Sequence, residues 1–378
     1  MPERAAADLV AEARALLADA PVFDGHNDLA WEIRRLSGGD LAAVDPGASL
    51  AGRTHTDLER LVRGGVGAQF WSVYAPSNVP EVEALAITLE QVDLVRRMVD
   101  AHPGRLALAV SAGDCLRARA SGRIASLLGA EGGHCIAGSL GILRDLHRLG
   151  VRYLTLTHND STAWADSATD QPRAGGLSDL GRQVVGEMNR VGMLVDISHV
   201  AVSTMHAALD ATTRPVIFSH SSARALVDHP RNVPDDVLQR LSGNGGVCQV
   251  AFVPSFVSTP CWEWTELARR TMAERGLDAS DLEARMRFEA TFAAESPPPR
   301  ASVADVADHV DHVREAAGVD HVGLGGDFDG TDRLPEGLED VSCYPHLIAE
   351  LLARGWSRDE LARLTWANAL RVVGDACA

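Results

Sequence analysis

The sequence predicts an α/β fold: a (β/α)8 barrel of the TIM type, with an N-terminal helix and a long insertion after the seventh strand. Eight apolar, strand-like runs alternate with helix-like stretches, as expected for parallel strands that are buried on both faces. Six of the runs end on a histidine or a carboxylate, and the carboxyl ends of parallel barrel strands converge on one site. The eight runs are Val22–Asp28, Gly64–Tyr74, Ser126–Glu131, Val151–His158, Met193–His199, Pro215–His220, Gly245–Phe252 and His321–Asp327.

Helix-like segments separate these runs, as the barrel requires. The first 20 residues mix charged residues and alanine with a helical period, which predicts a helix over 1–20. Further helices are expected at Val82–Ala101, Ser139–Leu149, Asp179–Val191, Ala201–Ala211, Pro234–Leu241 and Val303–Ala317.

One apolar run is surplus to a count of eight strands. Leu106–Val110 competes with Ser126–Glu131 for a place in the barrel, and we favour the second run because Glu131 and two glycines close it. A doubly wound open sheet is the alternative fold. It gathers ligands at one or two crevices only, which suits six converging strand ends poorly.

We expect a single domain over residues 1–378, because no linker rich in Pro, Gly and Ser divides the chain.

The insertion Val253–Arg300 is too long for a plain strand-to-helix connection, and it should lie over the carboxyl ends of the strands. Phe256, Trp262 and Trp264 are expected to line a pocket there.

Composition excludes several classes of partner. A net charge of −17 argues against nucleic acid and against an anionic membrane surface. No apolar run reaches the length of a transmembrane helix, and the N-terminal residues lack the apolar core of a signal peptide. The 6 cysteines show no CxxC motif, so we expect a reduced protein in the cytoplasm.

All 35 basic residues are arginines, and this limits the possible chemistry. A chain without lysine forms no Schiff base, anchors no pyridoxal phosphate and has no P-loop lysine. It also lacks a carboxylated lysine that bridges two metals. A shared metal ligand must therefore be Asp or Glu.

The ends of the strand-like runs offer metal ligands. His26 and Asp28 are two residues apart in a strand, so both side chains point to one face and can chelate an ion. A plain turn is the alternative interpretation of the segment DGHND, with Asp24 in a turn role. Glu131 is the natural carboxylate to bridge two ions. For a single Glu before two glycines, an exposed turn residue is the more common outcome.

Two histidines end successive runs. His199 and His220 can supply neutral imidazole nitrogens to a second ion, although one such histidine alone is as often a core residue. His158 ends the run before them and is either a metal ligand or a positioned hydrogen-bond donor. Together, these ligands indicate a metal-dependent hydrolase.

Three further residues complete the candidate site. Asp327 follows two glycines on the last run and is a candidate general base. Asp329 is expected to support the site or to form a turn. Arg231 lies in the region after the sixth run, where a guanidinium can hold a carboxylate, although most arginines are surface residues.

The other histidines are expected outside the site. His309 and His312 lie in an acidic, helix-patterned stretch and are interpreted as part of a solvated face. His134 and His229 lie nearer the site and are expected to be supporting or incidental. The remaining ones, in helical or loop contexts without a partner pattern, are His55, His102, His147, His206 and His346.

Short motifs resemble those of the membrane (renal) dipeptidase family, which belongs to the amidohydrolase superfamily. The resemblance covers nearly the whole chain, in order and with consistent spacing. The motifs are GHND at Gly25–Asp28, EGG at Glu131–Gly133, LTLTHN at Leu154–Asn159, DISH at Asp196–His199, SHS at Ser219–Ser221, HPRN at His229–Asn232 and GDFDG at Gly326–Gly330.

The resemblance implies a barrel with two zinc ions that hydrolyses dipeptides, including those of the L-Xaa–D-Xaa type. By resemblance, a hydroxide that bridges the ions attacks the peptide bond. The implied zinc ligands are His26 and Asp28 for one ion, His199 and His220 for the other, and Glu131 for both.

The resemblance also implies roles for the remaining site residues. His158 polarises the scissile carbonyl, Arg231 holds the C-terminal carboxylate of the dipeptide, and Asp327 transfers the proton. A related amidohydrolase acting on a lactone, an N-acyl amino acid or a phosphoester is the alternative. A catalytically inactive relative is a third hypothesis, which the complete ligand set disfavours.

The chain differs from the better-known animal members of the family. Its N-terminal residues do not resemble their secretory signal, and its last residues, RVVGDACA, do not form the hydrophobic tail of a lipid-anchor signal. We therefore expect a soluble, bacterial-type member without membrane attachment. A homodimer is compatible with the sequence, but the disulfide-linked form of the animal members is not carried over.

Overall fold

The computed structural model describes residues 6–278 and 282–377, and these contain the predicted (β/α)8 barrel. The strands follow the order β2-β1-β9-β8-β7-β6-β5-β4, and a β2–β4 pairing closes the ring. All of these pairings are parallel. The barrel strands are β1 (Val22–Asn27), β2 (Val66–Ser72), β4 (Ile124–Glu131), β5 (Val151–Thr155), β6 (Leu194–Asp196), β7 (Val216–Phe218), β8 (Val247–Val250) and β9 (Val322–Leu324).

The surplus apolar run is also a strand, β3 (Leu106–Leu108), and it does not displace β4. Ala125 of β4 pairs with Ala68 of β2 on one edge and with Ala107 of β3 on the other. Further along the second edge, residues 128–131 of β4 pair with β5. The two apolar runs therefore do not compete, because β3 and β5 share one edge of β4.

The observed helices follow the predicted alternation. Two predicted helices have the observed bounds: α7 (Asp179–Val191) and α13 (Val303–Ala317). The predicted N-terminal helix is α1 (Ala6–Asp19), and the first five residues of the predicted range lie outside the described residues. The other α-helices are α2 (Leu29–Ser37), α3 (Leu58–Arg63), α4 (Glu81–Ala101), α5 (Ala112–Ala120), α6 (Leu140–Arg148), α8 (Val202–Ala211), α9 (Asp235–Asn244), α10 (Pro254–Val257), α11 (Thr259–Glu274), α12 (Leu282–Glu295), α14 (Tyr344–Ala353), α15 (Arg358–Ala362) and α16 (Asn368–Ala376). Short 3-10 helices lie at Gly133–Ile136, Val319–His321 and Val341–Cys343, and a π-helix lies at Arg363–Ala367.

Local sequence explains where several helices begin and end. The Ser178 side chain accepts a hydrogen bond from Gly181 N at the start of α7, and Gly192 ends that helix in the left-handed conformation at φ 84°. Ser302 and Asp305 form a reciprocal capping box at the start of α13. These signals are local, which is why the bounds of the two helices follow from the sequence.

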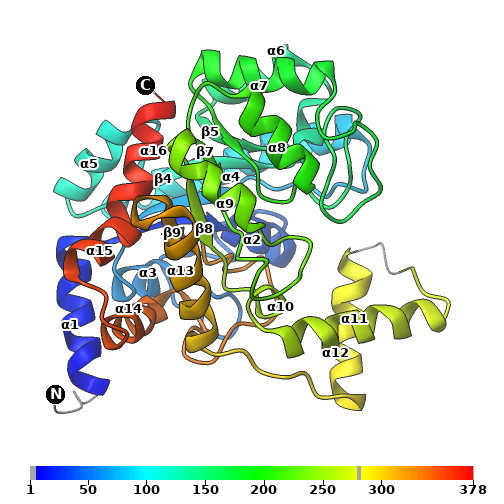
Figure 1. Cartoon of the computed structure of the whole chain (residues 1–378). Helices are drawn as coiled ribbons and strands as arrows, with labels where there is room; N and C mark the ends of the chain where they lie inside the picture. The colour runs from blue at the N-terminus through cyan, green and yellow to red at the C-terminus, as the bar shows by residue number, and fades with distance from the viewer. Residues whose placement is uncertain (1–5, 279–281, 378) are drawn as a thin grey trace.

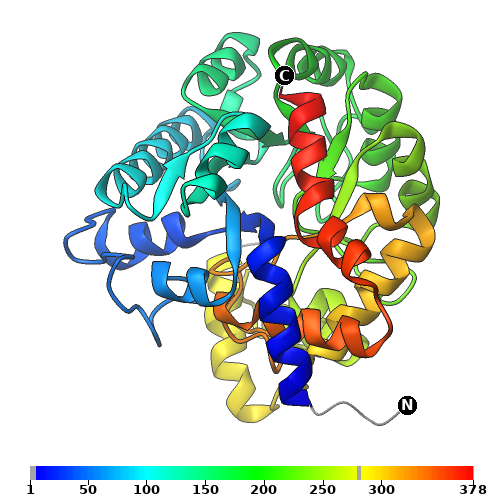
Figure 2. The same cartoon turned by 90° about the vertical axis from the view of Figure 1, so that its left-hand side faces the viewer.

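Helix α16 closes the amino-terminal end of the barrel, as Figure 2 shows with this helix lying across the end of the ring. Its buried Val372 and Val373 pack in one cluster with Trp366 and with the barrel residues Phe23 and Phe70. Apolar side chains therefore fill this end of the barrel. The polar side chains of the candidate site lie at the opposite end, where the strands have their carboxyl ends.

The insertion after β8 contains helices α10, α11 and α12. Helices α11 and α12 project from the body on the side away from α1 and α16 (Figure 1). Trp264 belongs to a separate apolar cluster between these two helices, together with Phe288 and Phe292. The expectation that Trp264 lines a pocket with Phe256 and Trp262 is therefore wrong for Trp264, because its ring packs inside the hairpin.

Among the described residues, no helix combines the length and the apolarity needed to cross a membrane.

Candidate metal centre

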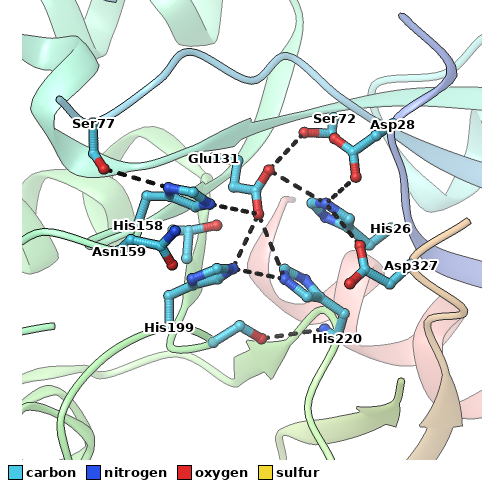
Figure 3. A network of polar contacts seen from close by, with 12 residues as sticks. His26, Asp28, Ser72, Ser77, Glu131, His158, Asn159, His199, His220 and Asp327 are labelled. Atoms are coloured by element: carbon cyan, nitrogen blue, oxygen red, sulfur yellow. Dashed lines mark hydrogen bonds and ion pairs between the residues drawn. The ribbon is translucent and has the colours of Figure 1, made fainter. Parts of the chain in front are cut away.

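Glu131, the last residue of β4, lies at the centre of a buried cluster of imidazole and carboxylate groups (Figure 3). Its Oε1 atom lies 3.1 Å from His199 Nε2 and 3.5 Å from His220 Nε2. Its Oε2 atom lies 3.4 Å from His26 Nε2. One oxygen of this carboxylate therefore faces His199 and His220 and the other faces His26, as the oxygens of a ligand shared by two cations do.

The first set gathers around His26 of β1. Its Nε2 atom lies 3.1 Å from Asp28 Oδ2 and 3.9 Å from Asp327 Oδ1. Asp28 directly precedes α2, whereas Asp327 follows β9, almost three hundred residues later in the chain. The parallel pairing of β1 with β9 brings the three side chains together at one end of the barrel.

The second set consists of His199 and His220, which follow the neighbouring strands β6 and β7. Their Nε2 atoms lie 2.9 Å apart. At most one proton fits between two ring nitrogens at this distance, so at least one of the two Nε2 atoms is unprotonated.

His199 and Asp327 have an unusual backbone conformation. His199 has φ 66° and Asp327 has φ 58°, in the left-handed region that residues other than glycine rarely adopt. Local contacts hold both: Ala168 N donates to His199 O at 2.8 Å, and Gly330 N donates to Asp327 O at 3.2 Å. Such conformations cost about 1–3 kcal/mol and cluster at functional sites.

His158 and the two histidines of the second set are neutral at pH 7. Burial lowers the pKa values of His158, His199 and His220 well below that of a free imidazole, and nearby positive groups, including Arg231, add to the effect. Neutral imidazoles have a free lone pair, which is the form that binds a metal ion.

The carboxylates of the first set repel one another. Burial raises the pKa of Asp327 well above its ordinary value, and the charges of Asp28 and Glu131 raise it further. Burial lowers the pKa of His26, but the neighbouring Tyr153 and the acidic groups outweigh this effect and raise it well above its ordinary value. Buried carboxyl groups that repel one another in this way are stabilised in their ionised form by bound cations.

The residues present therefore fit metal ions. Among the described residues, none accepts or donates a hydrogen bond of good geometry at buried His26 Nε2, although Asp28 Oδ2 lies 3.1 Å away. The described part of the chain contains three groups of three side chains whose ligand atoms all lie within 4.8 Å of one another. Nitrogen and oxygen donors of this kind suit divalent metals. The groups are His26 with Glu131 and His220, Glu131 with His158 and His199, and His26 with Asp28 and Asp327.

His158 lies at the edge of the cluster. Its Nε2 atom lies 4.0 Å from Glu131 Oε1, farther than the nitrogens of the other three histidines. Its Nδ1 atom lies 3.5 Å from Ser77 Oγ, which donates to Asp160 Oδ2 at 2.5 Å. This position suits a hydrogen-bond donor to a bound molecule.

Arg231 reaches the cluster from the loop after β7. Its guanidinium is buried, lies 5.2 Å from the centre of the Phe256 ring and donates to His220 O at 3.3 Å. Burial lowers its pKa to about 10, while the charges of Asp327 and Glu131 raise it, so it remains a cation at pH 7. Its Nη1 atom also donates to Ser221 Oγ at 3.4 Å, and a buried guanidinium has five N–H donors, enough to hold a carboxylate as well.

Sequence reasoning missed the role of Asp24, which it assigned only to a turn. The buried Asp24 carboxylate accepts hydrogen bonds from His26 N at 2.9 Å, from Gly326 N at 3.2 Å and from the hydroxyl of Tyr344. Burial raises its pKa to about 6. Asp24 thus joins the ligand strand β1 to the loop that carries Asp327, a pairing with no signal in the local sequence.

Other supporting contacts were also missed. Tyr153 Oη lies 2.8 Å from His26 Nδ1, Ser72 Oγ donates to Glu131 Oε2 at 3.0 Å, and Ser219 Oγ lies 2.8 Å from His220 Nδ1. The only signal in the sequence is that all three follow or belong to strand-like runs.

The expectation of a solvated histidine pair is wrong for His309. This side chain is 1% exposed, and its Nδ1 atom accepts a hydrogen bond from Ala223 N at 2.9 Å. His312 lies 2.8 Å from Asp235 and is partly buried. His309 lies on the face of α13 that packs against the barrel, together with Val306, Val310 and Val313.

The two histidines expected near the site do lie close to it. His134 Nε2 lies 3.1 Å from Ala75 O, in a supporting contact. The ring centre of His229 lies 4.5 Å from Phe256 and 4.2 Å from Trp262, so these two residues of the insertion contact the loop that carries Arg231. Asp329 accepts from His55 N at 2.6 Å and has φ 67°, in agreement with a supporting turn residue.

The barrel and the buried ligand cluster together define a metal-dependent (β/α)8 enzyme. The family model for membrane dipeptidase (peptidase family M19) matches residues 10–378. The chain therefore belongs to the membrane dipeptidase family, peptidase family M19.

Similar proteins agree with this family. Dipeptidase 3 of Rattus norvegicus is 42% identical over 366 residues, which cover 96% of this chain and 66% of the rat protein. Dipeptidase verJ of Clonostachys rogersoniana is 41% identical over 377 residues, which cover 97% of this chain and 87% of that protein. The crystal structure of the probable dipeptidase PvdM from Pseudomonas aeruginosa has the same fold, with a TM-score of 0.85, 24% identity and 98% of both chains covered. The chain thus spans a little less than two thirds of the length of the rat relative.

Proposed function

We propose that this chain is a dipeptidase that hydrolyses the peptide bond of dipeptides with the help of two zinc ions. One observation carries the proposal: Glu131 Oε1 lies 3.1 Å from His199 Nε2 and 3.5 Å from His220 Nε2, whereas Glu131 Oε2 lies 3.4 Å from His26 Nε2. The names of the relatives, dipeptidase 3 and dipeptidase verJ, support the substrate class.

The proposed ligands are divided between the ions. His26 and Asp28 would hold one zinc ion, His199 and His220 the other, and Glu131 both. Nitrogen and carboxylate oxygen donors are the ligands that catalytic zinc sites use. Such a pair of ions supplies activation of a water molecule and polarisation of a carbonyl oxygen.

The residues around the ligands perform the remaining tasks. His158 donates a hydrogen bond where negative charge develops on the carbonyl oxygen of the substrate. Asp327 Oδ1 takes a proton from the attacking water and gives it to the departing amine nitrogen. Arg231 holds the C-terminal carboxylate, which places the scissile bond of a two-residue substrate at the cluster.

The first test measures metal content and substrate range. The purified enzyme should contain about two zinc ions per chain and should cleave L-Xaa–L-Xaa or L-Xaa–D-Xaa dipeptides but not longer peptides. Removal of the metal with a chelator should abolish turnover, and zinc should restore it. Zinc-loaded protein that is inert on a broad panel of such dipeptides would refute the substrate class.

The second test addresses Arg231. Wild-type enzyme should prefer dipeptides with a free carboxylate over the same dipeptides amidated at the C-terminus. Arg231→Ala should remove this preference by lowering kcat/KM about 10²–10³-fold on the free acid alone, and Arg231→Lys should retain part of it because lysine keeps the charge without the planar pair of donors. An equal, small loss on both substrate forms would instead favour a related amidohydrolase that recognises no terminal carboxylate.

A further inference from the structure

Asp196, the last residue of β6, is a completely buried carboxylate outside the proposed ligand set. Its Oδ1 atom accepts hydrogen bonds from two backbone groups, Ser198 N at 3.1 Å and Ser219 N at 3.0 Å. Its Oδ2 atom accepts from two hydroxyls, Thr155 Oγ1 at 2.6 Å and Ser219 Oγ at 2.7 Å. Four donors around one carboxyl group are satisfied by the ionised form, which accepts and does not donate.

Ser219 connects this carboxylate to a proposed zinc ligand. Ser219 Oγ lies 2.8 Å from His220 Nδ1, and all three side chains are buried. A hydroxyl has one proton, and Ser219 donates it in a hydrogen bond to the Asp196 carboxylate. Ser219 Oγ must then accept a hydrogen bond from His220, so the ring proton of His220 lies on Nδ1.

A neutral imidazole with its proton on Nδ1 has its lone pair on Nε2. In His220, Nε2 is the atom that lies 3.5 Å from Glu131 Oε1 and 2.9 Å from His199 Nε2. The opposite tautomer would direct an N–H group at the cation position. The direction of the hydrogen bonds from Asp196 through Ser219 therefore decides whether His220 can bind an ion.

We propose that Asp196 and Ser219 are positioning residues that hold His220 in the tautomer with the proton on Nδ1, so that Nε2 binds the cation shared with His199 and Glu131. This inference rests on the proposed metal centre. The ion of the first set is supported differently, because His26 Nδ1 contacts Tyr153 Oη at 2.8 Å. The two ions can therefore be weakened independently.

Asp196→Asn tests the direction of the hydrogen bonds, not merely their presence. Two backbone N–H groups face Oδ1, so the amide oxygen of Asn must occupy that position and its NH2 group must face the two hydroxyls. The NH2 group then donates to Ser219 Oγ, and the Ser219 proton turns to His220 Nδ1 at 2.8 Å, which is nearer than the other acceptor, Ser198 Oγ at 3.5 Å. The substitution keeps the shape of the side chain and reverses the tautomer, which should weaken binding of the second zinc ion about 100-fold.

Ser219→Ala removes the hydroxyl that links Asp196 to His220 Nδ1, but it does not favour the opposite tautomer of His220. The His220 tautomer is then free, and we expect a loss of about 10-fold in the affinity for the second ion. The decisive comparison is the double variant Asp196→Asn/Ser219→Ala, which has the same charge as Asp196→Asn alone. If Ser219 transmits the wrong tautomer in the single variant, its removal should raise the zinc affinity of the double variant above that of Asp196→Asn.

Two measurements that do not depend on catalytic activity test these expectations: the zinc affinity and the tautomer of His220. Competition with a chromophoric chelator gives the affinity of each zinc ion, and only the affinity of the second ion, which His199 and His220 would bind, should change. Nitrogen-15 spectra of metal-free protein labelled at histidine report the tautomer of His220, whose signals are identified by their loss in His220→Gln. Wild type should show a protonated Nδ1, and Asp196→Asn a protonated Nε2.

Thr155→Val is the matched control, because it deletes a hydrogen bond to the same Asp196 oxygen and leaves the contact between Ser219 and His220 in place. It should lower the melting temperature while the zinc affinities change less than twofold. A double variant that binds zinc more weakly than either single variant, or an unchanged His220 tautomer in Asp196→Asn, would overturn the inference. Wild-type protein that binds fewer than two zinc ions would instead refute the proposed metal centre.

Discussion

Three carboxyl groups lie close together in the buried metal centre. Asp28, Glu131 and Asp327 are all buried in one cluster, with the buried cation Arg231 beside them. Bringing like charges together in a buried site costs free energy, and bound dications offset that cost. The residues of the site therefore lower the stability of the metal-free protein, but the same residues are needed to bind the metal ions.

Asp327→Asn should separate these two effects. The neutral amide cannot take a proton, so kcat should fall about 10²–10⁴-fold. Because burial and the charges of Asp28 and Glu131 raise the pKa of Asp327, neutralising the group should also raise the melting temperature of the metal-free protein at pH 7. Kinetics and calorimetry measure the two effects, and metal analysis should still find both zinc ions. A variant that loses activity only because it loses an ion would contradict the proton-transfer role.

His309 should make stability depend on pH. Burial lowers its pKa from 6.5 to about 4, so the folded protein holds the neutral ring while the unfolded chain is protonated below pH 6.5. The contribution of His309 to stability is therefore complete above pH 6.5 and is lost as the pH falls towards 4. The loss amounts to about 3 kcal/mol over this range.

The measurement compares urea unfolding of wild type and His309→Gln between pH 7 and pH 4.5. Glutamine can accept the hydrogen bond from Ala223 N but does not titrate, so the difference in unfolding free energy should shift in favour of the variant as the pH falls. The exposed His346 offers a control, because His346→Gln should follow the wild-type pH dependence. Parallel curves for wild type and His309→Gln would contradict this explanation.

The position of His309 could have been predicted from its neighbours. It lies three residues after Val306 and four before Val313, so it shares their helix face. The surrounding acidic residues of the stretch suggested a solvated face. Periodicity, not local charge, decides which side of a helix is buried.

Among the strands and helices, the insertion hairpin of α11 and α12 depends on a residue from a distant loop. Arg333 Cζ lies 4.3 Å from the centre of the Trp264 ring on α11, and Arg333 Nη2 lies 3.2 Å from Glu289 Oε2 on α12. The apolar cluster inside the hairpin is small. Arg333 therefore helps to hold this hairpin in place.

Arg333→Ala should loosen the hairpin and leave the barrel intact. A loss of about 1 kcal/mol in local stability corresponds to about fivefold faster amide hydrogen exchange in α11 and α12. Exchange in the barrel strands should not change. Arg300→Ala, which removes an exposed pair with Glu336, is the control and should leave exchange in the hairpin unchanged. Faster exchange throughout the chain would show that Arg333 stabilises the entire fold.

For the complete chain, metal binding should contribute to stability. Each zinc ion present at 100 times its dissociation constant adds about 2.7 kcal/mol to the free energy of unfolding. A chelator should therefore lower the melting temperature of wild type, and zinc should restore it.

Glu131→Gln should lose most of this response together with activity, because both ion positions share Glu131. Exposed Glu315→Gln is the matched control and should respond as wild type does. An equal response in Glu131→Gln would mean that zinc stabilises the protein elsewhere.

The sequence by itself determined the barrel and the set of candidate ligands. Buried parallel strands produce continuous apolar runs, and ligands at their ends stand out because His, Asp and Glu interrupt apolar patterns. Helices with strong caps, such as α7 and α13, were also predicted with their bounds. These features depend on residues that are close together in the chain.

Only the tertiary structure decided how the site is supported. Asp24 meets Tyr344, and Asp196 reaches Ser219, through side chains that lie 320 and 23 residues apart. It also decided that β3 and β5 share one edge of β4. These contacts arise when the barrel closes and brings distant strands into register, and no periodicity within a single segment carries that information.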